Sequence, residues 1–431
     1  MRELGRQFAE VTYQQAEAKC DFGRSVVYEG TEYRRLSEPT PHREVATLFG
    51  KITLWRRGYR DTNRTAPEPT LFPIEQALGL VEGATPALAE AAARAMAQAG
   101  ASQQTTLARL KEEHGVALGV KRLRAMVAEV ESQMTPHRRA QQVRQVLKWL
   151  EKAAESPGPN KPVLSVGRDG VTLANRPHGC YEVAATATLT VYDGDRHRLG
   201  SVYLGYTPES HQPTMSRELT ALVKGVLSKC GDTPQLVYLT DAGDVECGYF
   251  ADVLRYLRHP QTGERLKWRR IIDYYHAASR LTTLGEALFG GGTREAASWA
   301  AKMRKVLKKP NGVFRVLHSA AALAARRQLS KSRRKDYQRA YNYLRDRSSH
   351  LRYADYRRQG LPIGSGVTEA ACKTLFTQRL KLSGMRWSKP GAQTILNLRS
   401  ILLSGVWQAA YRASLTATPA TFERSDHQKA A

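Results

Sequence analysis

The chain has 431 residues, of which 42% are hydrophobic and 25% are charged, a composition typical of a globular protein with a sizeable core. No apolar run approaches the roughly 18 residues that a membrane-spanning helix needs, and the charged start MRELGRQFAEV differs from a secretory signal. The five cysteines are scattered without a CxxC pair, which excludes a zinc ribbon and indicates a reducing cytoplasm. The net charge of +26 favours a polyanionic partner, and double-stranded nucleic acid is the commonest in a cell.

Residues 1–80 predict a short helix followed by a small β-rich region. Segments 31–36 and 43–60 alternate apolar and polar residues around Gly50, which predicts a basic hairpin that carries Arg56 and Arg57. These arginines either contact phosphate groups or blunt a solvated strand edge.

Residues 81–156 have a helical pattern. Apolar residues recur at helical spacing over 105–130, and Gly115 interrupts them where a tight turn would lie. The segment predicts a helix, a glycine-containing turn and a second helix. It is either a plain helical hairpin or a DNA-binding helix-turn-helix, in which Lys121, Arg122 and Arg124 would enter the major groove.

After the linker ESPGPNKP (155–162), the sequence pattern changes from one that predicts helices to one that predicts strands. Strands are expected at 163–171, 185–192, 199–206 and 234–241, with a fifth in the stretch 268–276. Helices are expected at 216–229 and near 247–257, and Asp193-Gly194 predicts a hairpin turn. The resulting order β-β-β-α-β-α-β fits an α/β ribonuclease-H-like core with a mixed five-stranded sheet over 160–280.

Residues 281–360 predict an all-α insertion into this core. Lys and Arg number 19 over 291–360 against 4 Asp and Glu, so the insertion either clamps a DNA backbone or presents a solvated surface. Residues 361–412 would complete the core with helices at 367–382 and 392–411. The polar segment 413–431 is expected to be a disordered tail.

Three acids lie where strands and helices meet in this pattern. Asp169 lies at the end of the first strand, Asp241 follows the fourth, and Glu369 lies in the first turns of the late helix. Three carboxylates at one sheet edge could hold two Mg²⁺ ions, with Mn²⁺ as an alternative, for phosphodiester chemistry. Each acid alone could instead be a turn or capping residue, and Asp244, which competes with Asp241, is expected to cap the next helix.

Several motifs carry a family resemblance, and they are GRDGV (167–171), LVYLTDAG (236–243), IIDYYHA (271–277), LPIGSGVTEAACKTLFTQRLKLSGMRW (361–387) and TLFGKITLWRRGYR (47–60). With them the chain resembles, from about residue 30 to 412, a DDE transposase of a bacterial insertion sequence of the ISKra type, related to Mutator-type transposases. The resemblance implies that Asp169, Asp241 and Glu369 are the catalytic triad.

Asp273 and His276 form a D-x-x-H pair that resembles the C/D-x-x-H motif of Mutator-type transposases. The pair either acts beside the acid cluster or is a structural hydrogen-bonded pair. DNA contacts are expected in the late run, from Lys373, Arg379, Lys381, Arg386 and Trp387. Trp387 either stacks on an unpaired base or lies in the core. The stretch GYRDTNRTAPEPTLFP (58–73) lacks the cysteine-rich zinc element of related transposases. The abrupt start of the sequence is expected to reflect either weakened recognition of the terminal repeats or a shortened open reading frame.

These features together predict a transposase that binds the terminal inverted repeats of its element and performs metal-dependent strand cleavage and strand transfer. Two alternatives stay open, namely a ribonuclease-H-like DNA nuclease without strand transfer and an inactive DNA-binding repressor derived from a transposase. The expected partners are inverted-repeat and target DNA and at least a second copy of the chain, with no membrane. The expected location is the cytoplasm, associated with the bacterial nucleoid.

Overall fold

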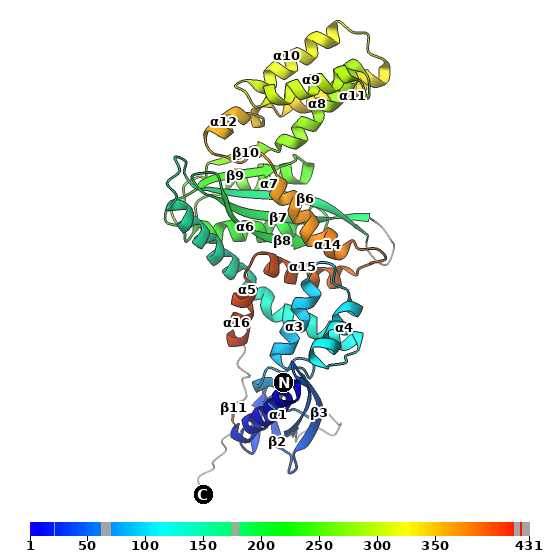
Figure 1. Cartoon of the computed structure of the whole chain (residues 1–431). Coiled ribbons are helices and arrows are strands. Elements are labelled where there is room, and N and C mark those ends of the chain that lie inside the picture. Colours follow the sequence, from blue (N-terminus) through cyan, green and yellow to red (C-terminus); the bar gives the residue numbers. More distant parts are fainter. Residues whose placement is uncertain (21, 62–69, 175–180, 418–422, 425–431) are drawn as a thin grey trace. The chain divides into compact units, whose positions relative to one another are not determined.

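The computed structural model describes residues 1–20, 22–61, 70–174, 181–417 and 423–424. The chain divides into two compact units (Figure 1). The first unit comprises Met1–Arg138, Asn397–Leu402 and Val406–Ala431, and the second comprises Arg139–Leu396 and Leu403–Gly405.

The first unit begins with helix α1 (Arg2–Lys19) and two small β-structures. A four-stranded sheet has the order β11-β1-β2-β5, with strands β1 (Ser25–Tyr28), β2 (Thr31–Arg35), β5 (Tyr59–Asp61) and β11 (Glu423–Arg424). A separate antiparallel hairpin pairs β3 (Thr40–Thr47) with β4 (Gly50–Arg56). Gly50 has a φ of 123° at the start of β4, a conformation that glycine adopts readily. The predicted hairpin around Gly50 is therefore confirmed.

The helices of this region are α2 (Pro73–Ala77), α3 (Pro86–Ala97), α4 (Gln103–His114), α5 (Val120–Ala154) and α16 (Trp407–Ala417). Ser102 caps α4 in a reciprocal capping box with Thr105, and α4 ends at Gly115 in the left-handed conformation. The predicted helix, glycine turn and helix are confirmed as local structure. The second helix is 35 residues long, and α5 contributes to both units.

The second unit contains a mixed five-stranded sheet with the order β10-β9-β6-β7-β8. Its strands are β6 (Val163–Ala174), β7 (Tyr181–Tyr192), β8 (Arg198–Tyr206), β9 (Gln235–Thr240) and β10 (Trp268–Ile272). Strands β6, β9 and β10 are parallel, whereas β7 and β8 are antiparallel to their neighbours. With α6 (Pro213–Leu227) and α7 (Asp244–Asp252) between them, the predicted order β-β-β-α-β-α-β is confirmed.

Side chains that alternate along the strands divide the interior of this unit into two cores. Leu236 and Tyr238 of β9 belong to a core shared with α5, α6 and α7. Val237 and Leu239 belong to a second core shared with the helices after β10. This alternation arises because successive residues of a strand point to opposite faces of the sheet.

The second core contains the predicted all-α insertion. Its helices are α8 (Tyr274–Phe289), α9 (Arg294–Leu307), α10 (Gly312–Ala325), α11 (Lys331–Asp346) and α12 (Tyr353–Arg358), with a 3₁₀ turn η2 (Ser348–His350). Helix α8 begins before residue 281, because Asp273 caps its N-terminus directly after β10. His276 is therefore helical and not part of the fifth strand.

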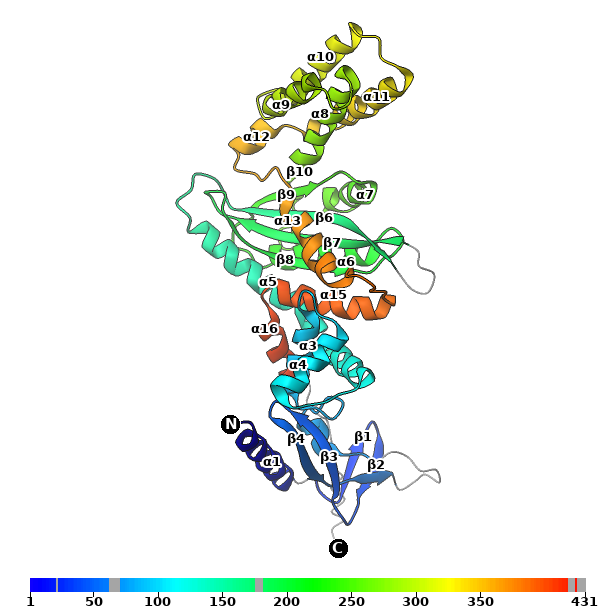
Figure 2. The ribbon, with the colours of Figure 1, turned by 45° about the vertical axis from the view of Figure 1, so that its right-hand side comes forward.

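The late helix consists of α13 (Gly366–Ala371), a π-helical turn (Cys372–Thr377) and α14 (Gln378–Leu380). It runs across the sheet in both views and contacts β6 and β7 (Figure 2). The single helix predicted at 392–411 is wrong, because Gly405 has a φ of 69° and separates α15 (Lys389–Leu403) from α16.

The chain end differs from the expected disordered tail. Helix α16 reaches Ala417, and Glu423–Arg424 pairs with β1. Residues 418–422 and 425–431 lie outside the described part, as do 62–69 of the cysteine-free stretch and Cys180. Within the described part of the chain, no helix combines the length and apolar character needed to cross a lipid bilayer.

Candidate active site

The carboxyl ends of the parallel strands β9 and β10 place two aspartates at one edge of the sheet. Asp241 directly follows β9, and Asp273 directly follows β10. The backbone N–H of Asp273 donates to the Thr240 carbonyl oxygen at 2.8 Å, which continues the pairing of the strands. Both aspartates therefore emerge together because parallel strands end at a common edge.

Asp169 reaches the same region from the central strand β6. The pairing of β6 with β9 ends at Gly167, whereas its pairing with β7 continues past Asp169. The carboxylate accepts the Gly170 N–H at 2.7 Å and the Cys372 thiol at 3.2 Å. Burial is the largest influence and raises the pKa of Asp169, and the nearby Asp241 raises it further, whereas His276 lowers it.

Gly167 permits the late helix to cross the sheet beside this edge. A Cβ atom at position 167 would lie 1.9 Å from Thr368 Oγ1 of α13, a distance shorter than any nonbonded contact. The hydroxyls of Thr368 and Thr188 lie 2.9 Å apart in the buried contact between α13 and β7. A glycine in β6 thus determines how closely α13, which carries Glu369, approaches the strands.

A hydrogen-bonded loop connects Glu369 to the D-x-x-H pair. Asp273 is fully buried and accepts the backbone N–H groups of His276 and Ser365. The Ser365 hydroxyl donates to Glu369 Oε1 at 3.1 Å, and His276 Nε2 lies 3.7 Å from the same oxygen. Loop residue Ile363 accepts the Tyr274 N–H at 2.8 Å. Residues about 90 positions apart in the sequence are therefore held in one local network.

The acids and the histidine predicted from the sequence lie at this edge, but their spacing differs from the expected triad. One ligand atom each of Asp273, His276 and Glu369 lies within 4.8 Å of the others, the spacing of a single metal ion. Among the described residues, Asp169 and Asp241 form no such group with Glu369. That Asp169, Asp241 and Glu369 share ions stays a prediction.

Sequence reasoning missed a further acid at this edge. Glu246 lies in the first turn of α7 and is 7% exposed. Burial raises the pKa of Glu246, and Asp241 and Asp169 raise it further. The sequence signal that could have identified Glu246 is its position in the first helical turn after Asp241. The competing Asp244 is exposed at the start of α7, and the N-cap is Gly243, so Asp244 does not cap the helix as expected.

The insertion contributes a tyrosine beside Asp241, and two arginines lie against the ring of that tyrosine. Tyr343 of α11 donates its hydroxyl to the Asp241 carbonyl oxygen at 3.1 Å. The guanidinium of Arg280 lies 4.7 Å from the ring centre of Tyr343, and that of Arg347 lies 4.4 Å from it. Burial raises the pKa of Tyr343, whereas both arginines lower it. Because these contacts are long-range, no sequence pattern indicated them.

The donor set of this edge fits a hard divalent cation. Asp169, Asp241 and Glu246 lie close enough to repel one another, and burial, followed by this repulsion, raises the pKa values of Asp169 and Glu246. Carboxylate oxygens are ligands suited to Mg²⁺ and Mn²⁺, whereas the imidazole of His276 favours transition metals. The residues present therefore fit Mg²⁺ or Mn²⁺.

The expected DNA-contacting residues of the first unit are partly engaged within the protein. Lys121 and Arg57 are exposed. Arg122 donates to the carbonyl oxygens of Glu82 and Gly83, at 2.7 and 2.9 Å. Arg124 is exposed and donates to Gln103, and Arg56 pairs with Glu75 and stacks on Phe72. The guanidiniums of Arg56 and Arg122 are thus engaged in contacts within the first unit, and their contacts with DNA stay predictions.

In the late run, Lys373, Lys381 and Arg386 are exposed and accessible to a polyanion. Arg379 is fully buried, so it cannot contact DNA directly as expected, and its guanidinium lies 5.0 Å from the ring centre of Trp387. Trp387 is half-buried, and its indole N–H donates to the Leu380 carbonyl oxygen at 3.1 Å. Trp387 is therefore neither a fully buried core residue nor a fully exposed platform for base stacking.

Comparison with protein-family models and with the sequences of curated proteins gives no match for this chain. The sheet order, the acidic edge and the positive charge therefore carry the functional interpretation.

Proposed function

We propose that the chain is a DDE-type DNA transposase whose second unit has a ribonuclease-H-like core. The observation that carries the proposal is the acidic edge of a sheet with the order β10-β9-β6-β7-β8, where Asp169 lies near Asp241 and His276, and His276 lies beside Glu369. A central strand, a neighbouring parallel strand and a crossing helix each supply one acid. The resemblance of the surrounding motifs to ISKra-type transposases supports the same function.

Each residue then has a role that follows from its contacts. Asp169, Asp241 and Glu369 would hold two divalent ions. When bound, such ions stabilise the attacking and leaving oxygens of a phosphodiester. Asp273 holds the start of α8 and the loop at Ser365, so it positions His276 and Glu369. The His276 side chain is half exposed beside Glu369, so it can form a hydrogen bond with a substrate oxygen.

The basic surfaces would bind DNA for this reaction. The excess of Lys and Arg over 291–360 lies in helices directly connected to the acidic edge through α8. Lys373, Lys381 and Arg386 are exposed on the late helix and the turn after it. Phosphate contacts of this kind position a duplex without reading its sequence.

The test incubates the protein with linear duplex DNA that carries the sequences flanking its coding region, with Mg²⁺, Mn²⁺ or EDTA, and maps the cuts to the nucleotide. Asp241→Asn should abolish metal-dependent cleavage and leave DNA affinity equal or higher, because a negative charge is removed. The matched control is Asp244→Asn, an exposed acid three positions away, which should retain cleavage. Cleavage by Asp241→Asn at the wild-type rate would exclude Asp241 from the site.

A second assay separates the transposase from its alternatives. A pre-cut end with a free 3′-hydroxyl is incubated with a circular target plasmid. Joined products support strand transfer. Cleavage without joining would instead favour a nuclease of the same architecture, and binding without either reaction would favour a repressor.

A further inference from the structure

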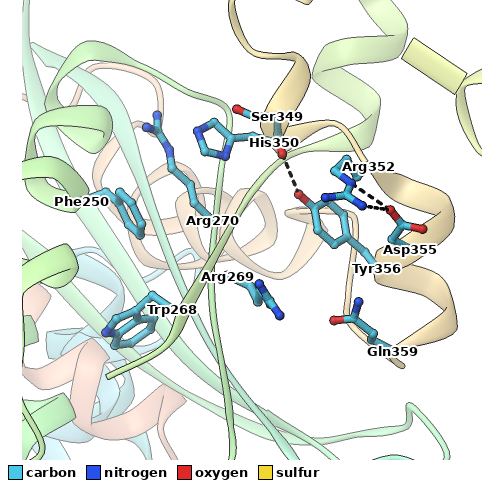
Figure 3. A pocket seen from close by; sticks show the side chains of 10 residues that line it. All are labelled: Phe250, Trp268, Arg269, Arg270, Ser349, His350, Arg352, Asp355, Tyr356 and Gln359. Atoms are coloured by element: carbon cyan, nitrogen blue, oxygen red, sulfur yellow. Dashed lines mark hydrogen bonds and ion pairs between the residues drawn. The ribbon is translucent and has the colours of Figure 1, made fainter. Parts of the chain in front are cut away.

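A cavity of about 390 Å³ lies along the outer edge strand of the second unit's sheet (Figure 3). Its walls come from the beginning of β10, from α7, and from η2 and α12. Trp268 and Arg269 begin β10, whereas Asp273 follows the end of that strand. The cavity is therefore separate from the acidic edge.

The charge of this cavity is positive and poorly compensated. Arg269 and Arg270 form no ion pair with any residue that the structure describes. Arg270 donates to the Cys247 sulfur, a weak acceptor, and its Nε is buried without a partner among the described residues. Asp355, the only acid among the described lining residues, already pairs with Arg352. Unsatisfied donors of this kind favour an anionic ligand.

Aromatic rings flank these cations on both sides of β10. Figure 3 shows Phe250 and Trp268 beside Arg270 on one side of the strand, and Tyr356 beside Arg269 on the other. The Arg270 guanidinium lies 5.4 Å from the ring centre of Phe250. A nucleobase of any sequence can stack on such a ring, because every base has a π-face.

We propose that this cavity binds a nucleotide of an unpaired DNA strand, with its base against the aromatic rings and its phosphate at Arg269 and Arg270. Its volume is that of a small-ligand site, and cations interleaved with aromatic rings match the chemistry of a nucleotide. The choice of a DNA strand as the source rests on the proposed function, because cleavage at an element's end exposes single-stranded DNA near the sheet.

Photo-crosslinking tests this proposal directly. A short single-stranded oligonucleotide containing iododeoxyuridine is irradiated with the full chain in EDTA, and the crosslinked peptides are identified by mass spectrometry. The expected crosslinks fall on the peptides that contain Trp268 or Tyr356. Because no metal is present, and because Asp241→Asn should crosslink equally well, a failure of the cleavage reaction leaves this measurement unaffected.

Charge-reversed variants measure the affinity for the same strand by fluorescence anisotropy. Arg269→Glu changes an exposed lining residue and should weaken binding about tenfold, the effect of losing one charge-assisted contact. Arg357→Glu makes the same charge change at an exposed residue of α12 that does not line the cavity, and it should weaken binding much less. Equal loss in both variants would overturn the proposal in favour of a general electrostatic effect.

Competition experiments distinguish a DNA strand from other anionic ligands. Unlabelled single strand added before irradiation should lower the crosslink yield, whereas the same sequence as a duplex should lower it much less. A lower yield with ATP at equal nucleotide concentration would assign the cavity to free nucleotides, and a lower yield with polyglutamate would assign it to an acidic peptide. Either result would overturn the assignment to a DNA strand, as would crosslinks that avoid both peptides.

Discussion

Gly167→Ala should displace the helix that carries Glu369. The new Cβ atom would lie 1.9 Å from Thr368 Oγ1 and 2.8 Å from Thr188 Oγ1, and the Thr368 Cβ atom would be 3.2 Å away. The Thr368 hydroxyl must therefore turn aside and lose its 2.9 Å hydrogen bond with Thr188. Both threonines are buried, so the lost partner cannot be replaced by solvent.

The magnitude follows from these contacts. A buried hydroxyl without a partner costs about 1–3 kcal/mol, and the remaining crowding at the Thr368 Cβ atom adds to it. Alanine is favoured over glycine within a strand by roughly 0.5–1 kcal/mol, which offsets part of the loss. The net destabilisation should be about 2 kcal/mol, or a roughly thirtyfold change in the unfolding equilibrium. Metal-dependent cleavage should fall as Glu369 moves.

Urea denaturation gives the stability, and hydrogen exchange of peptides from β6 and α13 shows whether the loss is local. The matched control is Gly231→Ala, because a Cβ atom there has nothing within 4 Å. Adding Thr368→Ala to Gly167→Ala should recover part of the loss, so that the double variant is less destabilised than the sum of the single variants. Equal unfolding midpoints for Gly167→Ala and Gly231→Ala would refute the reasoning.

Four further predictions concern the same unit and its substrate. Tyr343→Phe removes the hydrogen bond to the Asp241 carbonyl oxygen and should cost about 1 kcal/mol, measured by urea denaturation, with slower cleavage but unchanged DNA affinity. Burial and Arg270 lower the pKa of His350 below its usual 6.5. The unfolded state therefore binds the proton more readily, and the free energy of unfolding should fall as pH drops below 6.5. His350→Asn should remove this component of the acid denaturation profile. Replacing Mg²⁺ by Mn²⁺ should sustain cleavage, because carboxylate oxygens suit both ions. EDTA should stop cleavage and spare DNA binding, and release of the DNA by EDTA in a gel-shift assay would contradict this. If about 6 phosphates are neutralised, DNA affinity should fall roughly a thousandfold between 50 and 200 mM salt, and a flat titration would exclude this electrostatic mode.

The candidate site could be predicted from the sequence in outline. Asp241 was placed at the end of its strand because a buried apolar run stops there, and Glu369 was placed in a helix by the breakers before it. The contributions of Glu246 and Tyr343 could not be predicted, since each depends on how α7 and α11 pack against the sheet. The expected DNA contact of Arg379 was wrong for the same reason, because sequence alone does not show that its side chain is buried.

The local elements and the charge of this protein follow from its amino-acid sequence. Alternation of apolar residues, caps such as Ser102 and turns such as Asp193-Gly194 depend on neighbours within a few positions, and the +26 charge depends on composition alone. The spacing of the acids at the sheet edge, in contrast, depends on tertiary packing. That spacing depends on a helix crossing a strand at Gly167 and on a loop bonded to Asp273, and both contacts join segments far apart in the chain, whose meeting is governed by packing and not by local pattern.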